Sequence, residues 1–454
     1  MSIFERKKVV TRMAPSPTGH LHIGTARTAL YNYLFAKKHG GSFILRTEDT
    51  DKERSKKEYE DEIVEGLDWL GITWDAFYRQ SERAEIYRGY LEKAIQKGSA
   101  YLSKEESKMR PGEEVEVVRL KNPNKNITFT DEIRGEISFD TTELGDFVIA
   151  RSLDDALYHF TVVVDDHEME VTHVIRGEDH ISNTPRQILI QEAIGAERPQ
   201  YAHLPLILAP DRSKLSKRNG AVMLSEYRRQ GFVPAAIVNY LALLGWNPGT
   251  DRELYSLPEL VSAFDISGIQ KSGAVFDIEK LKWFNKEHMR GWSDEEFFEY
   301  MRARLTPELM ALPQWNEERL RRLAPTIRER TSVGEDIEEE CKKGEYDFAF
   351  TAPHVDPLMV KWKNDESPRV TLPRLQKLAE LIARMPEDQL PEDIKGYIWD
   401  YAVEVGKGEV LWPLRVALTG RERSPDPFTV IHIIGSAEAY NRIKVACDTI
   451  LRAP

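Results

Sequence analysis

Residues 14–25 read APSPTGHLHIGT, with two glycines and two histidines between an apolar segment and a segment of helical character. Val9 to Met13 predicts a short buried strand, and the apolar residues between Thr25 and His39 recur with the spacing of a helix. The start of such a helix presents free N–H groups and a partial positive charge, which favour a phosphate or a carboxylate. This stretch therefore predicts a strand–turn–helix unit with an anion site at the turn.

The segment that follows continues the same alternation. Phe43 to Arg46 predicts a second strand, and Ser55 with Glu58 predicts a capping box for a helix that reaches about Gly71. Alternating strands and helices are typical of an α/β domain with a parallel sheet. In such sheets, ligands bind at the carboxyl ends of the strands, where we expect residues 14–25 to lie.

The middle of the chain interrupts this pattern and then resumes it. Residues 98–145 are polar and rich in turns, which indicates an insertion. Thr184-Pro185-Arg186-Gln187 predicts a capped helix start in the resumed pattern. Strands are predicted in the insertion at residues 115–120 and 136–139, and after it at residues 160–164, 171–176 and 204–208.

The second half of the chain has a mostly helical pattern. Helices are predicted at residues 234–244 and 281–288, and further helices separated by prolines follow from about Ser293. Only residues 429–434 show some of the period-two alternation of a strand. We therefore expect the first half to carry the chemistry and the helical half to position a large partner.

A second stretch, residues 214–218, reads KLSKR and follows the strand expected at residues 204–208. Lysines on such a loop can follow the negative charge that develops on a departing pyrophosphate. Each stretch alone would also fit a surface feature, namely a capped helix with exposed histidines or a solvated basic loop. Together they favour activation of a carboxylate by ATP. A P-loop is excluded because Thr25 stands where that motif requires lysine, and the absence of GxGxxG argues against a dinucleotide-binding oxidoreductase.

The two stretches resemble the HIGH and KMSKS signatures of class I aminoacyl-tRNA synthetases, which read HIGT and KLSKR in this chain. Thr25 replaces the second histidine of many class I enzymes, a difference common among glutamyl enzymes. The surrounding residues, most densely from Thr11 to Lys282, are similar to those of the bacterial glutamyl-tRNA synthetase family. The resemblance implies ATP-dependent ligation of L-glutamate to the 3′ end of tRNA(Glu) through a glutamyl-adenylate, with AMP and pyrophosphate released.

The resemblance also implies a domain order. A Rossmann-like parallel-sheet catalytic domain would cover residues 1–90 and 160–224, with an inserted acceptor-end-binding domain at residues 91–159. A stem-contact region would follow at residues 225–292 and an all-helical anticodon-binding region at residues 293–454. The helical tail favours a glutamyl enzyme, since glutaminyl enzymes end in β-barrels. It also argues against the short relative that glutamylates a modified tRNA base.

Three charged residues end predicted strands beside the two signature stretches. Arg12 and Arg176 carry the forked guanidinium that pairs with a carboxylate, and Glu48 is suited to a substrate ammonium. Each arginine alone would also fit a surface salt bridge, whereas three such charges favour a pocket for an acidic amino acid. By resemblance, the glutamate-binding residues are Arg12, Ala14, Ser16, Glu48, Tyr158 and Arg176.

The nucleotide site is expected to combine both signature stretches. Gly19 and Gly24 are expected to let ATP approach the backbone closely. His22, Lys214 and Lys217 are the expected catalytic residues. The expected ATP-binding residues are Gly19, His20, His22, Gly24, Thr25, Asp179, His180, Leu206, Lys214, Ser216 and Lys217.

Magnesium is expected on the ATP phosphates, and no protein-bound metal is expected. Asp165 and Asp166 would point apart on a strand, and no spacing of the nearby acidic residues and histidines matches a zinc template. His173 is expected to face the same side as Met169 and Val171. Residues 98–145 contain no cysteine or histidine, so the zinc finger of some glutamyl enzymes is expected to be absent.

The composition sets the class of protein. With 454 residues, of which 41% are hydrophobic and 30% charged, two to four globular domains are expected. Cys341 and Cys447 cannot supply a disulfide framework, so we expect a reducing cytoplasm. No targeting peptide and no membrane-spanning apolar run is apparent.

The net charge of −12 argues against a nucleic-acid coat protein but permits a local basic face. We expect a monomer that binds tRNA(Glu), with tRNA(Gln) left open as a partner. Candidate tRNA contacts in the tail are Arg319, Arg321, Arg322, Arg328, Arg330, Trp362, Trp399 and Trp412.

Overall fold

The computed structural model describes residues 8–106, 112–215, 223–363 and 365–453. The chain divides into two compact units, Met1–His288 and Met289–Pro454, each with its own hydrophobic core. Within the described ranges, no helix is both long and apolar enough to cross a membrane.

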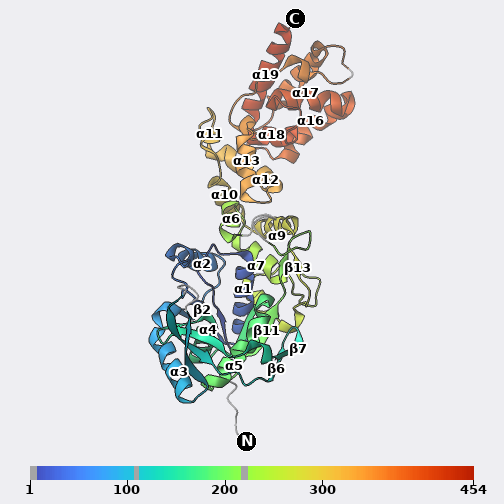
Figure 1. Ribbon diagram of the computed structural model, residues 1–454. Coiled ribbons are helices and arrows are strands. Elements are labelled where there is room, and N and C mark those ends of the chain that lie inside the picture. The colour runs from blue at the N-terminus through green and yellow to red at the C-terminus, as the bar shows by residue number, and fades with distance from the viewer. Residues whose placement is uncertain (1–7, 107–111, 216–222, 364, 454) are drawn as a thin grey trace. The chain divides into compact units, whose positions relative to one another are not determined.

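A parallel sheet lies at the centre of the N-terminal unit (Figure 1). β1 (Val10–Met13), β2 (Ser42–Thr47) and β3 (Ala76–Arg79) pair in parallel in that order. β10 (His173–Gly177) lies beside β1 and pairs in parallel with β11 (Gln200–Leu204). The predicted α/β class with a parallel sheet is confirmed.

Helix α1 (Ile23–Lys38) packs against β1 and β10. Ala26 and Ala29 are fully buried on the packed side, which lets the helix approach the strands closely. Because the turn from β1 leads directly to the start of α1, the helix N-terminus lies at the carboxyl edge of the sheet. The strand–turn–helix prediction for residues 14–25 is therefore confirmed.

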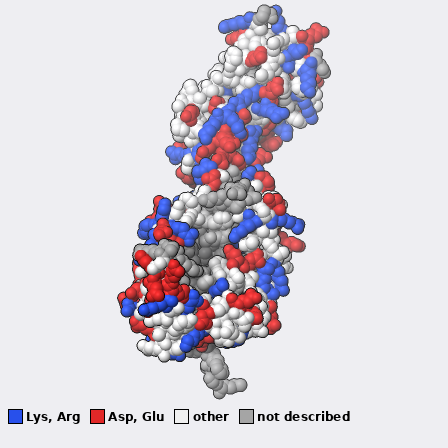
Figure 2. All heavy atoms as spheres, viewed as in Figure 1, with Lys and Arg blue, Asp and Glu red and all other residues white. Residues whose placement is uncertain are grey.

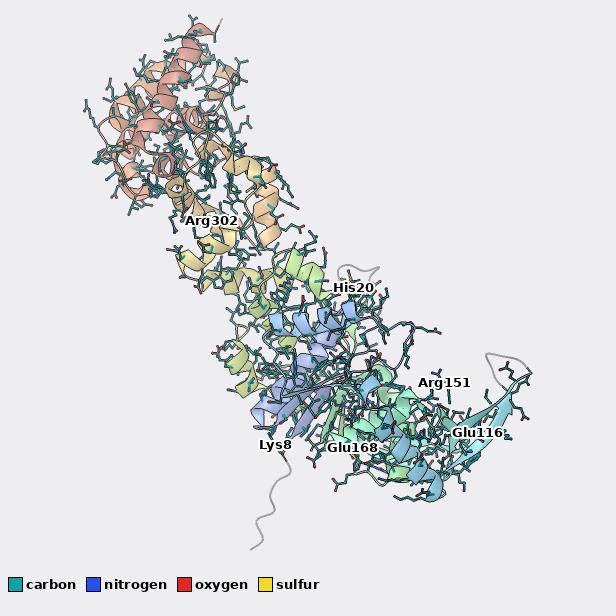
Figure 3. All side chains as sticks on the ribbon, turned by 90° about the vertical axis from the view of Figure 1, so that its left-hand side faces the viewer. Lys8, His20, Glu116, Arg151, Glu168 and Arg302 are labelled. Carbon is teal, nitrogen blue, oxygen red and sulfur yellow. The ribbon has the colours of Figure 1, made fainter. Side chains whose placement is uncertain are left out.

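The segment that interrupts the α/β pattern contains strands, as predicted for residues 98–145, and these strands pair antiparallel. A hairpin that carries Glu116 projects from the unit in Figure 3. A second antiparallel pair, β6 with β7, joins the parallel sheet, because Asp131 of β6 pairs with Tyr201 of β11. The bounds are β4 Ala100–Glu106, β5 Glu114–Leu120, β6 Asn126–Asp131, β7 Gly135–Asp140, β8 Phe147–Ser152 and β9 Asp155–Ala156.

The other elements of the N-terminal unit surround this sheet. A short parallel pair, β12 with β13, follows the main sheet in the chain. The bounds are α2 Lys57–Trp69, α3 Ala84–Gln96, α4 Tyr158–Glu168, α5 Thr184–Ile194, β12 Ile207–Leu208, α6 Leu224–Arg229, α7 Pro234–Leu243, α8 Leu257–Ala263, β13 Ala274–Val275 and α9 Ile278–Arg290.

The C-terminal unit is helical throughout its described residues, as the sequence predicts (Figure 1). Its core includes Phe298, Phe350, Leu375 and Ile443, all buried. The bounds are α10 Asp294–Arg302, α11 Pro307–Met310, α12 Glu317–Arg330, α13 Gly334–Lys342, α14 Pro357–Val360, α15 Leu372–Ile382, α16 Pro391–Val405, α17 Lys407–Thr419, α18 Pro427–Ile434 and α19 Ser436–Arg452. The finer division of the chain into four regions stays a prediction.

One predicted strand is a helix, because residues 160–164 belong to α4. Residues 429–434, which show some period-two alternation, belong to helix α18. A short apolar run reads equally well as a buried strand or as a buried helix, because periodicity cannot separate the two. Asp426 caps α18 through its side chain and Pro427 opens it, two signals that outweigh the alternation downstream.

Two predicted caps are also wrong, although their helices exist. α2 begins at Lys57 without a side-chain cap, and the hydroxyl of Ser55 has no hydrogen-bond partner among the described residues. α5 begins at Thr184 without a side-chain cap. There, the hydroxyl of Thr184 and the amide of Gln187 contact the guanidinium of Arg176 instead.

Candidate active site

A cavity of about 390 Å³ opens at the carboxyl ends of β1 and β10, beside the start of α1. Residues from the two signature stretches and from the predicted amino-acid pocket meet there. Its lining consists of Arg12, Met13, Ala14, His22, Gly24, Thr25, Arg27, Thr28, Glu48, Tyr158, Val162, Ile175, Arg176, Gly177, Asp179, His180, Pro205, Leu206, Ile207, Lys214 and Leu215.

Most of the predicted site residues line this cavity. They are Arg12, Ala14, His22, Gly24, Thr25, Glu48, Tyr158, Arg176, Asp179, His180, Leu206 and Lys214. Ser16, Gly19 and His20 are not part of the lining. Ser216 and Lys217 lie outside the described residues.

The start of α1 forms one wall of the cavity. His22 is the N-cap, and its Nδ1 accepts a hydrogen bond of 3.0 Å from the backbone N–H of Gly24. An imidazole that accepts at Nδ1 carries its proton on Nε2 when neutral, so Nε2 is a donor. A Cβ on Gly24 would lie 3.2 Å from Nδ1 of His22, so a larger residue there would crowd the imidazole ring. A Cβ on Gly19 would meet no atom within 4 Å, so its predicted steric role finds no support in the protein itself.

His20 and Ser16 lie on the outside of the signature turn. The side chain of His20 is 43% exposed, and its Nδ1 lies 2.6 Å from Oε2 of Glu62 on α2 (Figure 3). Ser16 is exposed, and its carbonyl accepts a hydrogen bond from Thr18. The motif thus presents His22 to the cavity and His20 to the neighbouring helix.

The KLSKR loop reaches the rim of the cavity through Lys214. Its Nζ lies 3.7 Å from Oδ2 of Asp179, and both side chains are more than half exposed. The backbone carries Leu215 back to the sheet by a hydrogen bond of 3.1 Å to Ile207. Lys214 is therefore an exposed ammonium at the cavity edge, paired weakly with a carboxylate.

The inner wall of the cavity consists of Arg12, Arg46, Glu48 and Asp166, whose opposite charges pair with one another. Arg46 is fully buried, and its Nη1 donates to Asp166 at 2.8 Å and its Nη2 to Glu48 at 3.2 Å. Nε of Arg12 donates to the same Asp166 carboxylate at 3.2 Å. Although burial acts to raise the pKa of Asp166, the guanidinium groups of Arg12 and Arg46 lower it below its ordinary value. Asp166 therefore fixes Arg12 as an ion pair in the cavity wall.

Asp165 faces a different set of partners because it lies on a helix. It accepts hydrogen bonds from Nε of Arg83 at 2.7 Å, from the amide of Gln80 and from the hydroxyl of Tyr87. The prediction that Asp165 and Asp166 point apart on a strand is wrong, since adjacent residues on α4 diverge by the helical rotation. Within the described residues, no group of three or more histidine, cysteine or acidic side chains is arranged to hold a metal.

Two titratable groups of the lining that differ from the arginines are Glu48, which is buried, and Tyr158, which is partly buried. Burial raises the pKa of Glu48 to about 7, against the opposing effects of Arg46 and Arg12. Burial, with the charge of Glu48, raises the pKa of Tyr158 to about 12. In the free protein, Glu48 therefore changes between its charged and its neutral form near pH 7.

Arg27 is a lining residue that the motif reading missed. It is buried, and it donates to the carbonyls of Leu244 and Pro205 rather than to a carboxylate. Helical spacing could have indicated Arg27 as a lining residue, because Arg27 and Thr28 follow Gly24 by three and four residues and lie on the same face of the helix. Burial lowers the pKa of Arg27.

The predicted tRNA contacts in the C-terminal unit are largely occupied by intramolecular partners. Figure 2 shows Lys and Arg interspersed with Asp and Glu on this unit. Arg321 pairs with Glu295, and Arg328 pairs with Asp294. Trp399 is the tryptophan with the most basic surroundings, since the ammonium groups of Lys395 and Lys407 lie 5.0 and 4.6 Å from its ring centre.

Family models match nearly the whole chain. The model described as the catalytic domain of "tRNA synthetases class I (E and Q)" matches residues 8–111 and 102–283. An "anticodon binding domain" model matches residues 296–447. The two matches follow the order of the two compact units.

Individual relatives agree with the family models. The glutamate–tRNA ligase of Carboxydothermus hydrogenoformans is 38% identical, over 96% of this chain and 99% of the relative. That of Aquifex aeolicus is 50% identical, over 62% of this chain and 67% of the relative. Among solved structures, a glutamate tRNA ligase from Elizabethkingia meningosepticum, in complex with its amino acid, superposes with a TM-score of 0.85 at 33% identity, covering 98% of this chain and 100% of that one.

Proposed function

The chain belongs to the class I aminoacyl-tRNA synthetases for glutamate and glutamine, and on that premise we propose that its cavity binds L-glutamate and ATP side by side. The enzyme is a glutamate–tRNA ligase, like its near full-length relatives. The observation that carries the placement of the site is the meeting of His22, Lys214 and Arg176 in one cavity.

The cavity charges suit glutamate. The substrate brings two carboxylates and one ammonium, and the lining offers Arg12, Arg27 and Arg176 together with Glu48. We propose that arginine holds the side-chain carboxylate and that Glu48 holds the ammonium, which leaves the α-carboxylate free to react. Ala14, Tyr158 and Ser16 complete the proposed set, although Ser16 would have to act from outside the lining.

The nucleotide is proposed to lie along the start of α1. Phosphate oxygens would accept hydrogen bonds from Nε2 of His22 and from the N–H group of Thr25. Leu206, Asp179 and His180 are proposed as contacts for the nucleoside. Lys214 and Lys217 would follow the pyrophosphate as its charge grows.

The reaction needs no covalent intermediate with a side chain. The α-carboxylate oxygen of glutamate attacks the α-phosphorus of ATP, the bond to the bridging oxygen breaks, and pyrophosphate leaves. A ribose hydroxyl of the terminal adenosine of tRNA, expected to be the 2′-OH, then attacks the glutamyl carbonyl and AMP leaves. Positioning and charge stabilisation by the residues above carry the rate.

Magnesium is proposed to arrive with ATP. This ion favours phosphate oxygens, water and one or two carboxylates. Of the two carboxylates in the lining, Glu48 is buried against Arg46, so Asp179 at the exposed rim is the one suited to the ion. The residues therefore fit a metal held mainly by substrate and water.

We propose tRNA(Glu) as the RNA substrate, with tRNA(Gln) as a second candidate. The anticodon-binding match over residues 296–447 supports a tRNA partner and argues against glutamylation of a modified base. We also propose that the enzyme acts as a monomer. A cytoplasmic location is proposed because Cys341 and Cys447 are free buried thiols.

The test is charging of purified tRNA(Glu) and tRNA(Gln) with labelled glutamate. We expect the unmutated enzyme to charge tRNA(Glu), and Lys217→Ala to lower kcat by ~10²-fold or more, because a transition-state charge contact is removed. Failure of the unmutated enzyme to charge either tRNA would overturn the proposed function. Charging of tRNA(Gln) as well would establish the broader specificity.

The pKa of Glu48 predicts how glutamate binding depends on pH. Because its pKa in the free enzyme is about 7, above the ordinary value of 4.5, Glu48 loses its charge as the pH falls below 7. We expect the KM for glutamate to rise roughly fivefold from pH 7 to pH 6, with little change in the KM for ATP. Pyrophosphate exchange in the presence of tRNA measures both constants, and Glu48→Gln should remove the pH dependence. A KM for glutamate that stays constant between pH 6 and pH 8 would contradict this role.

A further inference from the structure

Arg176 differs from Arg12 and Arg46 in the charge of its partners. Its Nη1 donates to Oε1 of Gln187 at 2.8 Å, its Nη2 to the hydroxyl of Thr184 at 2.9 Å, and its Nε to Nε2 of His203 at 3.1 Å. A longer contact of 3.5 Å joins Nη2 to the carbonyl of His180. None of these acceptors is a carboxylate, and Arg176 is buried.

Arg12 and Arg46 have the opposite arrangement, since both contact the carboxylate of Asp166. Their positive charge is thus largely cancelled inside the protein. Arg176 has no ion pair within the part of the chain that the structure describes, so its charge remains for a ligand in the cavity that it lines. One N–H of Nη1 also remains, because a guanidinium has five N–H groups and these contacts use four.

The amide of Gln187 brings a buried N–H donor that a carboxylate would not have. Its Oε1 faces Arg176, but its Nε2 is buried and has no hydrogen-bond partner among the described residues. A buried donor without a partner is unfavourable. Glutamate at position 187 would have no such donor and would form an ion pair with Arg176. The chain thus carries a neutral amide next to Arg176, although this leaves a buried donor without a partner among the described residues.

His203 is kept as a neutral acceptor from the other side. Its Nδ1 lies 2.7 Å from Oδ2 of Asp131, the last residue of β6 in the inserted segment. A carboxylate at Nδ1 places the ring proton there, which leaves the lone pair of Nε2 for Arg176. Burial lowers the pKa of His203, so the ring stays neutral, although Asp131 opposes this effect.

We propose that Gln187, Thr184 and His203 are positioning residues that orient Arg176 without neutralising it, with Asp131 of the insertion fixing the tautomer of His203. This role of the three neutral partners rests on the proposed function, in which Arg176 keeps its full positive charge for the side-chain carboxylate of glutamate. It makes position 187 a determinant of the preference for an anionic amino acid over its neutral amide.

The test is a pair of substitutions at position 187. Gln187→Glu is expected to raise the KM for glutamate at least ~10-fold, because the new carboxylate competes with the substrate for Arg176. The KM for ATP should stay within ~2-fold and the Tm should be unchanged or higher, since a buried arginine gains an ion pair. Gln187→Met, which removes the acceptor without adding charge, should raise the KM for glutamate much less.

Gln191→Glu is the matched control, because Gln191 is buried one turn further along α5 and contacts Tyr201 rather than Arg176. It is expected to lower the Tm and leave the KM for glutamate nearly unchanged. The proposal is overturned if Gln187→Glu fails to fold, or if it affects the KM for glutamate no more than Gln187→Met does. Turnover of glutamate by the unmutated enzyme tests the proposed function itself, so the two proposals can fail separately.

Discussion

Replacing Arg46 by methionine is expected to lower the free energy of unfolding of the N-terminal unit by about 3–5 kcal/mol, because it breaks a buried ion-pair group. Arg46 is fully buried, and it contacts Asp166 at 2.8 Å, Glu48 at 3.2 Å and Asp165 at 3.6 Å. Without it, three buried carboxylates would share only Arg12 and Arg83. Methionine keeps the apolar stem, so the loss reports the charge rather than a cavity.

Urea unfolding followed by circular dichroism measures this change, analysed as two transitions because the chain has two units. Arg79→Met is the control. Arg79 pairs with Glu60, but it is a third exposed, so its loss should cost at most about 1 kcal/mol. Equal losses for the two variants would contradict the interpretation of Arg46 as the centre of the inner wall.

Replacing Arg176 by methionine is expected to raise the KM for glutamate by ~10²-fold or more, because a substrate carboxylate would be buried without its partner. The stability should change little or increase, since Arg176 is a buried charge with only neutral partners in the free protein. Preference for glutamate over glutamine should fall in parallel.

Pyrophosphate exchange with glutamate and with glutamine, in the presence of tRNA, measures these effects, and thermal unfolding gives the stability. Arg198→Met provides the control, because Arg198 lies on the surface and pairs with Glu192. The interpretation of Arg176 fails if its removal lowers the Tm strongly while the ratio of the KM values for glutamate and glutamine is unchanged.

The elements with several agreeing signals were predictable from the sequence. α1 has helical periodicity and a cap at His22, and α7 has a proline at its first turn. The sequence of α4 predicts a strand instead, because Phe160 to Val164 is a continuous run of β-branched and aromatic residues. That run is buried on all sides of a helix, and burial depends on neighbours distant in the sequence.

The same limit applies to the prediction of the site residues from the sequence. Residues in motifs or at strand ends, such as His22 and Arg176, could be named from the sequence. Gln187, His203 and Asp131 could not, because each is an ordinary polar residue whose role depends on contacts with residues far away in the sequence or on other elements. The role of Arg46 could not be predicted for another reason. A charged residue inside a predicted strand normally faces water, whereas Arg46 is buried among three carboxylates.

The central claim is that glutamate and ATP occupy one cavity. Calorimetric titration with a stable glutamyl-adenylate analogue, in which a sulfamate replaces the acyl phosphate, tests it most directly. We predict one bound molecule per chain, an affinity at least ~10²-fold higher than that of glutamate, and competition with both substrates. An analogue that leaves the binding of either glutamate or ATP unchanged would contradict the account.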